Sequence, residues 1–417
     1  MPVELSTQER AMLDGHGGEG TATAMRILLE TAEVMEAPRL VPVTRAHIDG
    51  CLYHGRAGLD FAELLRGRGA RVAVPTTLNV SSLDLLHPGL VRLDEATAAH
   101  ARRLMDAYIA MGCRPTWTCA PYQLPDPPRL GEQIAWAESN AIVFANSVLG
   151  ARTERYGDFV DACCAITGRA PEVGLHTDAG RRARALVTVA SDVSSALLRE
   201  TAGLAALGHV IGATVGTRVP AIVGLPATTS PDGLKALGAA AASSGAVAMF
   251  HAVGITPEAP SLAAALGGLD PKQERSIAAG DLRAARDELG PAAGDTVGAV
   301  SLGTPHASAA EIDRILALVQ DHPPRVPVYV NTGRDVLSAS GIDGSDAPGI
   351  TFVTDTCTYL VPVIAAVDEP VMTDSAKWAW YAPGTLGTRT LFGTTEECLR
   401  SAELGRVWRD ERLWGEA

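Results

Sequence analysis

The sequence of 417 residues has few aromatic side chains and a shortage of positive charge. Phe, Trp and Tyr make up 5% of the chain, and 35 Lys and Arg stand against 48 Asp and Glu, which gives a net charge of −13. Because such a balance is poorly suited to neutralising phosphates, we expect no nucleic-acid partner. Hydrophobic residues reach 47%, so the chain can form a globular core and is not intrinsically disordered.

Long uninterrupted apolar runs are also missing. The most apolar stretch, Leu204–Ala227, contains His209 and Arg218 and is therefore a poor membrane span. Its glycines recur every four residues, which in a soluble chain is typical of close helix packing: Gly208, Gly212 and Gly216. The first ten residues have neither the basic start nor the apolar run of a signal peptide. We expect a cytoplasmic protein with no membrane partner and with reduced thiols.

Several common motifs of catalysis and metal binding are absent. The sequence contains no P-loop, no H-E-x-x-H, no C-x-x-C and no G-x-S-x-G. Gly15–Gly20 matches G-x-G-x-x-G, but a dinucleotide site requires a strand before the motif. Ser6 and Glu9 form a capping-box pattern, which predicts a short helix there and favours a glycine-rich loop after it.

Short β-branched runs alternate with longer stretches rich in Ala, Leu, Glu and Arg, and this alternation predicts an α/β fold with parallel sheets flanked by helices. The expected strands are Arg71–Val74, Leu186–Val189, Val219–Val223, Thr296–Ser301, Val326–Val330 and Ile350–Thr354. The expected helices are Ala22–Met35, Glu95–Met111, Glu132–Leu149, Ser194–Leu207, Leu282–Leu289 and Ala309–Gln320. The length suggests two or three lobes, whose boundaries the sequence does not place.

Polar side chains follow four of the expected strands. The segments are Pro75–Asn79, Gly303–His306, Asn331–Arg334 and Asp355–Cys357. In parallel sheets ligands bind at this edge. Each loop alone is better explained by turn and cap residues, but four together favour a shared site.

Seven cysteines are spread along the chain. Cys119 and Cys357 lie at expected strand-to-loop transitions, and Cys398 opens a helical stretch, where thiolates are favoured electrostatically. Spacing alone does not distinguish metal ligands from buried packing residues. The remaining four are interpreted as packing residues: Cys51, Cys113, Cys163 and Cys164.

A set of short segments in a fixed order resembles the aconitase X family over nearly the whole chain. They are Leu13–Gly15, Val74–Asn79, Glu138–Arg155, Gly174–His176, Gly303–His306, Val353–Cys357, Ser375–Lys377 and Cys398. The resemblance implies an aconitase-like α/β fold, with several lobes around a central cleft. It implies a hydro-lyase, and residues 1–417 would be the catalytic large region without the small swivel domain, which a partner subunit would supply.

The resemblance also implies the chemistry. Family members use an iron or iron–sulfur centre as a Lewis acid and dehydrate cis-3-hydroxy-L-proline or mevalonate 5-phosphate. Archaeal members often have Cys where this chain has Thr304, which favours the bacterial hydroxyproline type. A 2Fe–2S cluster, a 4Fe–4S cluster and a single iron all remain open. A non-catalytic binding or scaffold protein is the alternative of another class.

By resemblance, the metal ligands are Cys119, Cys357 and Cys398, since three thiolates leave one iron open to substrate. His306 and Lys377 are the catalytic candidates, and a structural histidine and a surface ion pair are their respective alternatives. Arg152 could hold the substrate carboxylate by a bidentate contact, or could form an ion pair instead. The other expected substrate contacts are Thr76, Thr77, Asn79, Asn146, Ser147 and Thr153. The proton-abstracting base is expected on the partner subunit.

Overall fold

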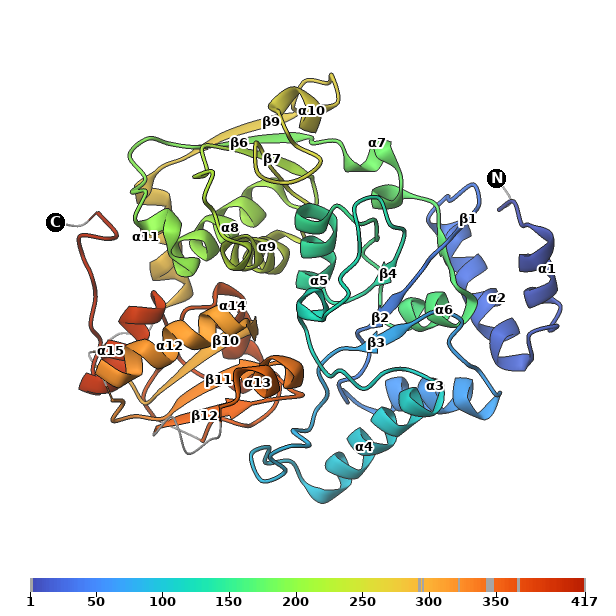
Figure 1. Cartoon of the computed structure of the whole chain (residues 1–417), viewed down its shortest axis with the longest axis horizontal. Coiled ribbons are helices and arrows are strands. Elements are labelled where there is room, and N and C mark those ends of the chain that lie inside the picture. Colours follow the sequence, from blue (N-terminus) through green and yellow to red (C-terminus); the bar gives the residue numbers. More distant parts are fainter. Residues whose placement is uncertain are drawn as a thin grey trace. The chain divides into compact units, whose positions relative to one another are not determined.

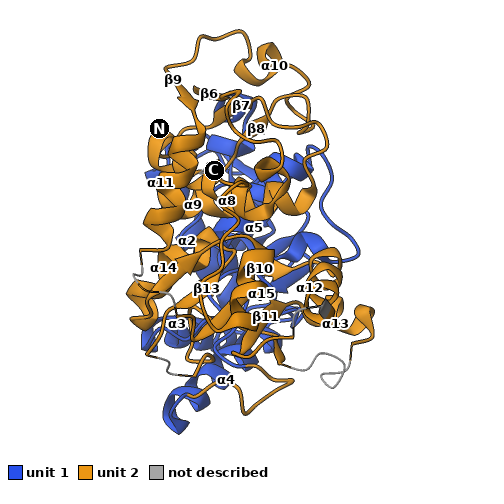
Figure 2. Ribbon diagram, turned by 90° about the vertical axis from the view of Figure 1, so that its left-hand side faces the viewer, with its two compact units in different colours: residues 1–83, 93–182 blue, residues 84–92, 183–417 orange. Residues whose placement is uncertain are grey.

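The computed structural model describes residues 3–291, 294, 296–321, 323–342, 349–365 and 368–415. The chain forms two compact units, coloured separately in Figure 2. Unit 1 consists of Met1–Leu83 and Leu93–Arg182, and unit 2 of Asp84–Arg92 and Ala183–Ala417. No helix in the described part of the chain has the length and apolarity needed to cross a bilayer.

Unit 1 is built around a small parallel sheet with the strand order β3–β2–β4 (Figure 1). Its strands are β2 (Ala46–Ile48), β3 (Thr76–Leu78) and β4 (Ala135–Trp136). All three residues of β2 are buried, as expected for a parallel strand covered on both faces. Two further strands pair antiparallel beside it: β1 (Leu40–Pro42) and β5 (Arg169–Pro171).

Two predicted elements of unit 1 differ from the structure. The strand expected at Arg71–Val74 begins only at Thr76, because Val72 N and Ala73 N donate to the carbonyl oxygens of Met111 and Ala165 and not to a neighbouring strand. The helix expected over Glu132–Leu149 is interrupted by β4 and begins at Ser139. Strands in this region are short and apolar, so the hydrophobic pattern of the sequence does not distinguish them from helical stretches.

Two expected helices of unit 1, Ala22–Met35 and Glu95–Met111, form close to their predicted bounds. Ser6 and Glu9 form the expected capping box, so the glycine-rich segment Gly15–Gly20 follows a helix and not a strand. The α-helices are α1 (Thr7–Leu13), α2 (Glu19–Val34), α3 (Arg56–Gly67), α4 (Glu95–Ala110), α5 (Ser139–Phe144), α6 (Val160–Thr167) and α7 (Asp178–Arg181). Shorter turns are the 3-10 helices η1 (Pro121–Gln123) and η3 (Gly174–His176) and the π-helix η2 (Ala145–Leu149).

Unit 2 contains two all-parallel sheets, and the predicted α/β class with parallel sheets flanked by helices is confirmed. The four-stranded sheet has the order β8–β7–β6–β9, with β6 (Ala185–Val189), β7 (Pro220–Val223), β8 (His251–Ala252) and β9 (Gln273–Ile277). The five-stranded sheet has the order β12–β11–β10–β13–β14, with β10 (Ala299–Ala307), β11 (Val328–Thr332), β12 (Ile350–Val353), β13 (Val371–Thr373) and β14 (Thr390–Phe392). In its register, Val300 lies opposite both Val328 and Met372.

Helices pack tightly on both sheets of unit 2. They are α8 (Thr201–Val215), α9 (Pro231–Gly245), α10 (Leu262–Leu266), α11 (Ala279–Leu289), α12 (Ala309–Asp321), α13 (Arg334–Ser340), α14 (Ala376–Leu386) and α15 (Thr395–Leu404), with the 3-10 turn η4 (Leu197–Arg199). A Cβ atom at Gly208 would lie 2.1 Å from the carbonyl oxygen of Leu237, so this glycine lets α8 approach α9, as its spacing predicted. Apolar side chains of α12 and α15 form one core with β10–β12, including Ile312, Leu399, Val300 and Val330.

Candidate functional site

The carboxyl ends of neighbouring strands in the five-stranded sheet carry a dense group of polar side chains. Thr304 and His306 close β10, Asn331 lies in β11, and Thr356 and Cys357 follow β12. All five residues are buried. Because parallel strands present their carboxyl ends at one edge, this is the edge at which α/β proteins bind ligands.

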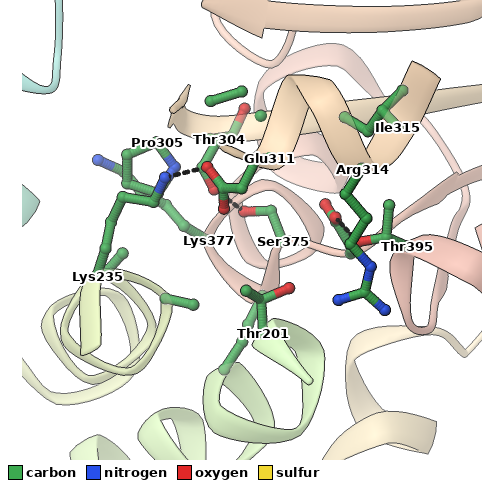
Figure 3. A pocket seen from close by; sticks show the side chains of 17 residues that line it. Thr201, Lys235, Thr304, Pro305, Glu311, Arg314, Ile315, Ser375, Lys377 and Thr395 are labelled. Atoms are coloured by element: carbon green, nitrogen blue, oxygen red, sulfur yellow. Dashed lines mark hydrogen bonds and ion pairs between the residues drawn. The ribbon is translucent and has the colours of Figure 1, made fainter. Parts of the chain in front are cut away.

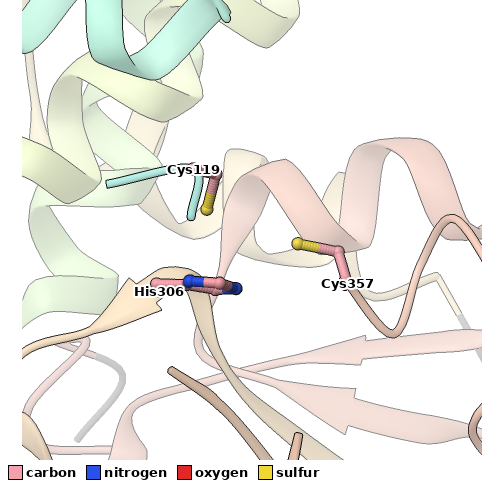
Figure 4. A group of neighbouring side chains, drawn as sticks. All are labelled: Cys119, His306 and Cys357. Atoms are coloured by element: carbon pink, nitrogen blue, oxygen red, sulfur yellow. The ribbon is translucent and has the colours of Figure 1, made fainter. Parts of the chain in front are cut away.

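His306 and Cys357 form the chemical centre of this group. Their ligand atoms lie within 4.8 Å of each other, and Figure 4 shows both side chains. His306 Nε2 donates to the carbonyl oxygen of Thr356 at 3.2 Å, which leaves the lone pair on Nδ1. Burial lowers the pKa of His306 to about 4, so the ring is neutral at pH 7. A neutral imidazole beside a thiol is a donor set that suits iron or zinc.

An unsatisfied hydroxyl supports the same interpretation. Thr356 Oγ1 is buried and has no hydrogen-bond partner among the described residues. Orphaned buried hydroxyls are rare in folded proteins and often mark the place of a missing ion, water or ligand. The residues at this edge therefore fit a metal centre.

The loop that carries Cys357 is held in an unusual backbone conformation. Asp355, two residues earlier, has φ of +63°, which is uncommon for a residue other than glycine. Arg334 binds the Asp355 carboxylate through Nε and Nη2, and Leu85 N donates to it at 2.9 Å. The Asp84 carboxylate accepts from Thr354 N and Thr354 Oγ1, each at 3.0 Å. The short segment Asp84–Arg92 thus braces the Cys357 loop.

Asn331 and Thr358 connect this loop to β10. Asn331 Nδ2 donates to the carbonyl oxygen of Leu302 at 2.9 Å and to Thr358 Oγ1 at 3.1 Å, and its Oδ1 accepts from Thr358 N at 3.1 Å. Trp378 Nε1 donates to Thr358 Oγ1 at 3.0 Å. This network fixes the position of Cys357 relative to His306.

A polar pocket of unit 2 adjoins the end of β10, and Figure 3 shows its lining. Lys235 extends from α9 and donates to the carbonyl oxygen of His306 at 3.3 Å, to Asp232 at 3.1 Å and to Glu311. Lys377 lines the same pocket, and its charge is one of those that lower the pKa of His306. The two predicted catalytic residues are therefore close enough to interact electrostatically.

Cys398, the second predicted ligand in unit 2, lies in the apolar core. Its Sγ approaches the carbonyl oxygen of Gly393 at 3.9 Å, and it packs with Leu302, Met372 and Leu399. Burial raises the pKa of the Cys398 thiol well above its usual value. In the described part of the chain, Cys398 belongs to no group of three or more potential ligands.

Cys119, the remaining predicted ligand, belongs to unit 1 and is also drawn in Figure 4. It lies in the loop between α4 and η1 and is buried. Trp117, two residues earlier, has φ of +45°. Cys119 and Cys357 thus each follow, by two residues, a residue with a left-handed backbone conformation. Asn140 Nδ2 donates to the carbonyl oxygen of Cys119 at 2.9 Å and holds the loop.

Three of the predicted substrate contacts lie on or directly after β3. Thr76 Oγ1 donates to the carbonyl oxygen of Val74 at 2.8 Å, and Thr77 Oγ1 pairs with His47 Nδ1 at 2.8 Å. Asn79 follows the carboxyl end of the strand, where its Nδ2 donates to Asp49. Only Asn79 is thus at the sheet edge that binds ligands in α/β folds.

The other predicted contacts surround the π-helix η2. Asn146 Nδ2 donates to the carbonyl oxygen of Thr153 at 2.9 Å, and Asn146 Oδ1 accepts from Thr153 N at 3.1 Å. Ser147 is buried within η2. The Arg152 guanidinium binds the Asp178 carboxylate and the carbonyl oxygen of His176. The contact with Asp178 is the ion pair that was the alternative to a substrate contact.

Family models match the chain in three consecutive segments. They are described as aconitase X first domain over residues 2–179, second domain over 183–287 and third domain over 297–403. This chain belongs to the aconitase X family. The first domain corresponds to unit 1, and the second and third correspond to the four-stranded and five-stranded sheets of unit 2.

Relatives within the aconitase X family agree with this placement. The chain is 44% identical over 96% of its length to a cis-3-hydroxy-L-proline dehydratase of Pseudomonas aeruginosa, of which it covers 70%. It is 37% identical to a phosphomevalonate dehydratase large subunit of Methanothermobacter thermautotrophicus, with 94% of this chain and 96% of that protein covered. The crystal structure of Thermococcus kodakaraensis aconitase X in its holo-form has a TM-score of 0.85 and 29% identity, with 96% and 100% coverage.

Sequence reasoning within this aconitase X chain missed two acidic residues at strand ends. Asp49 and Glu138 follow β2 and β4 closely. Asp161, in the first turn of α6, was missed as well, and its carboxylate accepts from Ala162 N and Asp49 N. The usable signal was a carboxylate directly after a short apolar run, which occurs at Asp49.

Proposed function

We propose that this chain is the catalytic region of a hydro-lyase that dehydrates cis-3-hydroxy-L-proline to Δ1-pyrroline-2-carboxylate. The observation that carries the proposal is the buried pair of His306 and Cys357 at the ligand edge of a parallel sheet. The relative from Pseudomonas aeruginosa, which is named for this reaction, supports the substrate.

The reaction removes a proton from C2 of the substrate and hydroxide from C3, and a double bond forms between these carbons. The resulting enamine tautomerises to the imine product, so the balance is the loss of one water. Hydroxide is a poor leaving group, and an iron centre, when bound, would supply Lewis-acid assistance to its departure.

We assign the ligands of the iron centre to Cys119, Cys357 and His306. His306 replaces Cys398 in the ligand set expected from the resemblance, because its neutral ring lies beside Cys357 while Cys398 is packed in the core. Two thiolates and an imidazole suit an iron–sulfur cluster as well as a single iron. The carbonyl oxygen of Thr356 orients the His306 ring, in the way that outer partners orient metal-bound histidines.

The remaining residues receive roles that match their positions. Lys377 is assigned to the substrate carboxylate as a point charge, and Asn79 to substrate contact at the sheet edge. The side chains assigned to shaping the walls of the substrate site are Thr76, Thr77, Asn146, Ser147 and Thr153. Hydrogen bonds of Thr76, Thr77 and Asn146 to neighbouring residues hold this part of the fold. Arg152 keeps its proposed carboxylate contact only if it leaves Asp178.

We further propose that the chain works in the cytoplasm with a small swivel-domain subunit that supplies the base. The archaeal relatives are named large subunits, which supports a small partner. Reduced thiols, which an iron centre requires, are maintained in the cytoplasm.

The test is an anaerobic preparation of the chain co-expressed with its small partner. We expect iron in the protein, a visible thiolate-to-iron absorption and turnover of cis-3-hydroxy-L-proline. Turnover of mevalonate 5-phosphate alone would instead support the activity named for the Methanothermobacter relative. A protein without iron and without either activity would favour a scaffold.

A further inference from the structure

Buried carboxylates that the proposed reaction does not yet use gather at the carboxyl end of the sheet in unit 1. Asp49 follows β2 directly, Glu138 follows β4 by two residues, and Asn79 follows β3 directly. Glu138 and Asn79 are 6% and 2% exposed, while Asp49 is partly buried and so remains reachable. Asp161 lies behind them and accepts from Asp49 N at 2.7 Å.

The acidic side chains of this group oppose one another's ionisation. Burial raises the pKa of Asp49, and the charges of Glu138, Asp158 and Asp161 raise it further. The hydrogen bond from Asn79 opposes this rise in the pKa of Asp49. Neighbouring carboxylates in a partly buried site repel one another unless a cation joins them.

An unsatisfied acceptor lies in the same place. Asn79 Nδ2 donates to Asp49 Oδ1, so the amide oxygen of Asn79 lies beside this carboxylate. Among the described residues, Asn79 Oδ1 has no hydrogen-bond donor although it is buried. A buried acceptor without a donor is costly, so the arrangement calls for a ligand that brings N–H groups.

We propose that Asp49, Glu138 and Asn79 recognise the secondary ammonium group of the substrate ring. This inference rests on the proposed function and names the residues that select the substrate. A protonated pyrrolidine nitrogen carries one positive charge and two N–H donors, which match a carboxylate and the orphaned amide oxygen. Glu138 adds the charge that compensates the cation without needing a direct contact.

The position of the group relative to Cys119 fits this role. Asn140 Nδ2 donates both to Glu138 Oε2 and to the carbonyl oxygen of Cys119, so one amide separates the carboxylate from the proposed iron ligand. In cis-3-hydroxy-L-proline the nitrogen and the leaving hydroxyl are attached to neighbouring carbons. The ammonium site must therefore lie close to the site of hydroxide departure.

The same charges explain how one substrate is preferred over another. Mevalonate 5-phosphate has no nitrogen and carries two anionic groups, so the carboxylates of Asp49 and Glu138 would repel it. Specific sites commonly combine attraction for one ligand with repulsion of its competitor.

The test compares two competitive inhibitors on the anaerobically prepared complex with its partner. L-Proline carries the ammonium group, and cyclopentanecarboxylate has the same ring and carboxylate without nitrogen. The wild type should bind L-proline more tightly. Asp49→Asn should reduce this preference by about tenfold or more because its hydrogen bond to a charged group is weakened, and Glu138→Gln should do the same because the compensating charge is removed. Glu33→Gln, on the exposed face of α2, is the matched control and should keep the preference.

Iron content and circular dichroism establish that each variant is folded and loaded. A wild type that shows no preference for L-proline overturns the inference, as do folded variants that keep it. An equal loss of affinity for both inhibitors in the variants also overturns it, since that indicates only a structural role. A wild type that dehydrates mevalonate 5-phosphate but not cis-3-hydroxy-L-proline overturns the proposed function together with the inference. Turnover of cis-3-hydroxy-L-proline with unchanged preference in the variants overturns the inference alone.

Discussion

Replacing Lys235 by Met should destabilise unit 2 and disturb the segment that carries His306. The Lys235 side chain is 3% exposed, and its ammonium donates to Glu311, to Asp232 and to the carbonyl oxygen of His306. Burial lowers the pKa of Lys235, but the charges of Glu311 and Asp232 outweigh this and leave the pKa raised. The stabilisation is therefore complete at neutral pH and is lost only as the pH rises above the ordinary lysine value. Methionine retains the apolar stem but offers no donor.

The magnitude follows from the exposure of the three acceptors. Glu311 and Asp232 are 24% and 23% exposed, so water replaces part of the lost interaction, whereas His306 is fully buried. A hydrogen bond to a charged group contributes about 1.5–3 kcal/mol, and relief of the buried ammonium offsets part of the combined loss. We expect a net loss of about 2–3 kcal/mol, which for a unit of this size lowers Tm by about 4–12 °C.

Thermal unfolding of the iron-free protein at pH 7, followed by calorimetry, measures this loss. Lys272→Met removes an exposed lysine from the same unit and should leave Tm nearly unchanged. Activity of Lys235→Met with the partner subunit should fall as well, since the backbone of His306 loses its support. A Tm within about 1 °C of the wild type would refute the reasoning that the buried ammonium supports this segment.

Three further predictions concern the metal centre and the buried polar residues. Cys357→Ser should lose iron and its visible absorption, while Cys398→Ser should keep both and lower only the stability; elemental analysis and spectra that show the opposite pattern would restore the ligand set inferred from the sequence. Burial lowers the pKa of His47 from its ordinary value of 6.5 to about 3. Below pH 6.5 the unfolded state therefore binds more protons than the folded state, and the protein loses stability as the pH falls. Between pH 7.5 and 5 this costs the wild type about 2 kcal/mol, and His47→Gln should lose that much less in urea unfolding; an identical pH dependence of the two proteins would contradict it. Asn331→Ala removes the bonds to Leu302 and Thr358 and should cost about 2–3 kcal/mol and weaken iron retention, as measured by chelator challenge; undiminished retention would show that this amide does not fix the Cys357 loop.

The fold was largely predictable because unit 2 contains several long, regular elements. The apolar runs of β10 and β11 and the amphipathic pattern of α12 are typical of a covered parallel sheet. In unit 1, β4 has only two residues inside a run that also suits a helix, and Glu138, with φ of +75°, turns the chain between them. Periodicity carries no signal for such a turn.

The candidate site was predictable one residue at a time but not as a set. His306 and Cys357 each follow a strand signal, yet their contact depends on the order β12–β11–β10, which local sequence does not contain. Cys398 has the expected position near a helix start, but Thr394 and Glu397 form the capping box there and the thiol faces the core. Asp49 and Glu138 lie at the same edge of the sheet only because β2 pairs with β4, and local sequence does not contain this pairing.

The path of the backbone between the two units has a practical consequence for dissecting the protein. The chain changes unit after Leu83, after Arg92 and after Arg182, so neither unit is one continuous stretch. A fragment that begins at Ala183 would contain His306 and Cys357 but not Asp84, whose carboxylate anchors Thr354. The loop that follows β12 in the five-stranded sheet is therefore held by a segment encoded in the first quarter of the gene. A working fragment of unit 2 would need residues 84–92 restored, as a linker or as an added peptide.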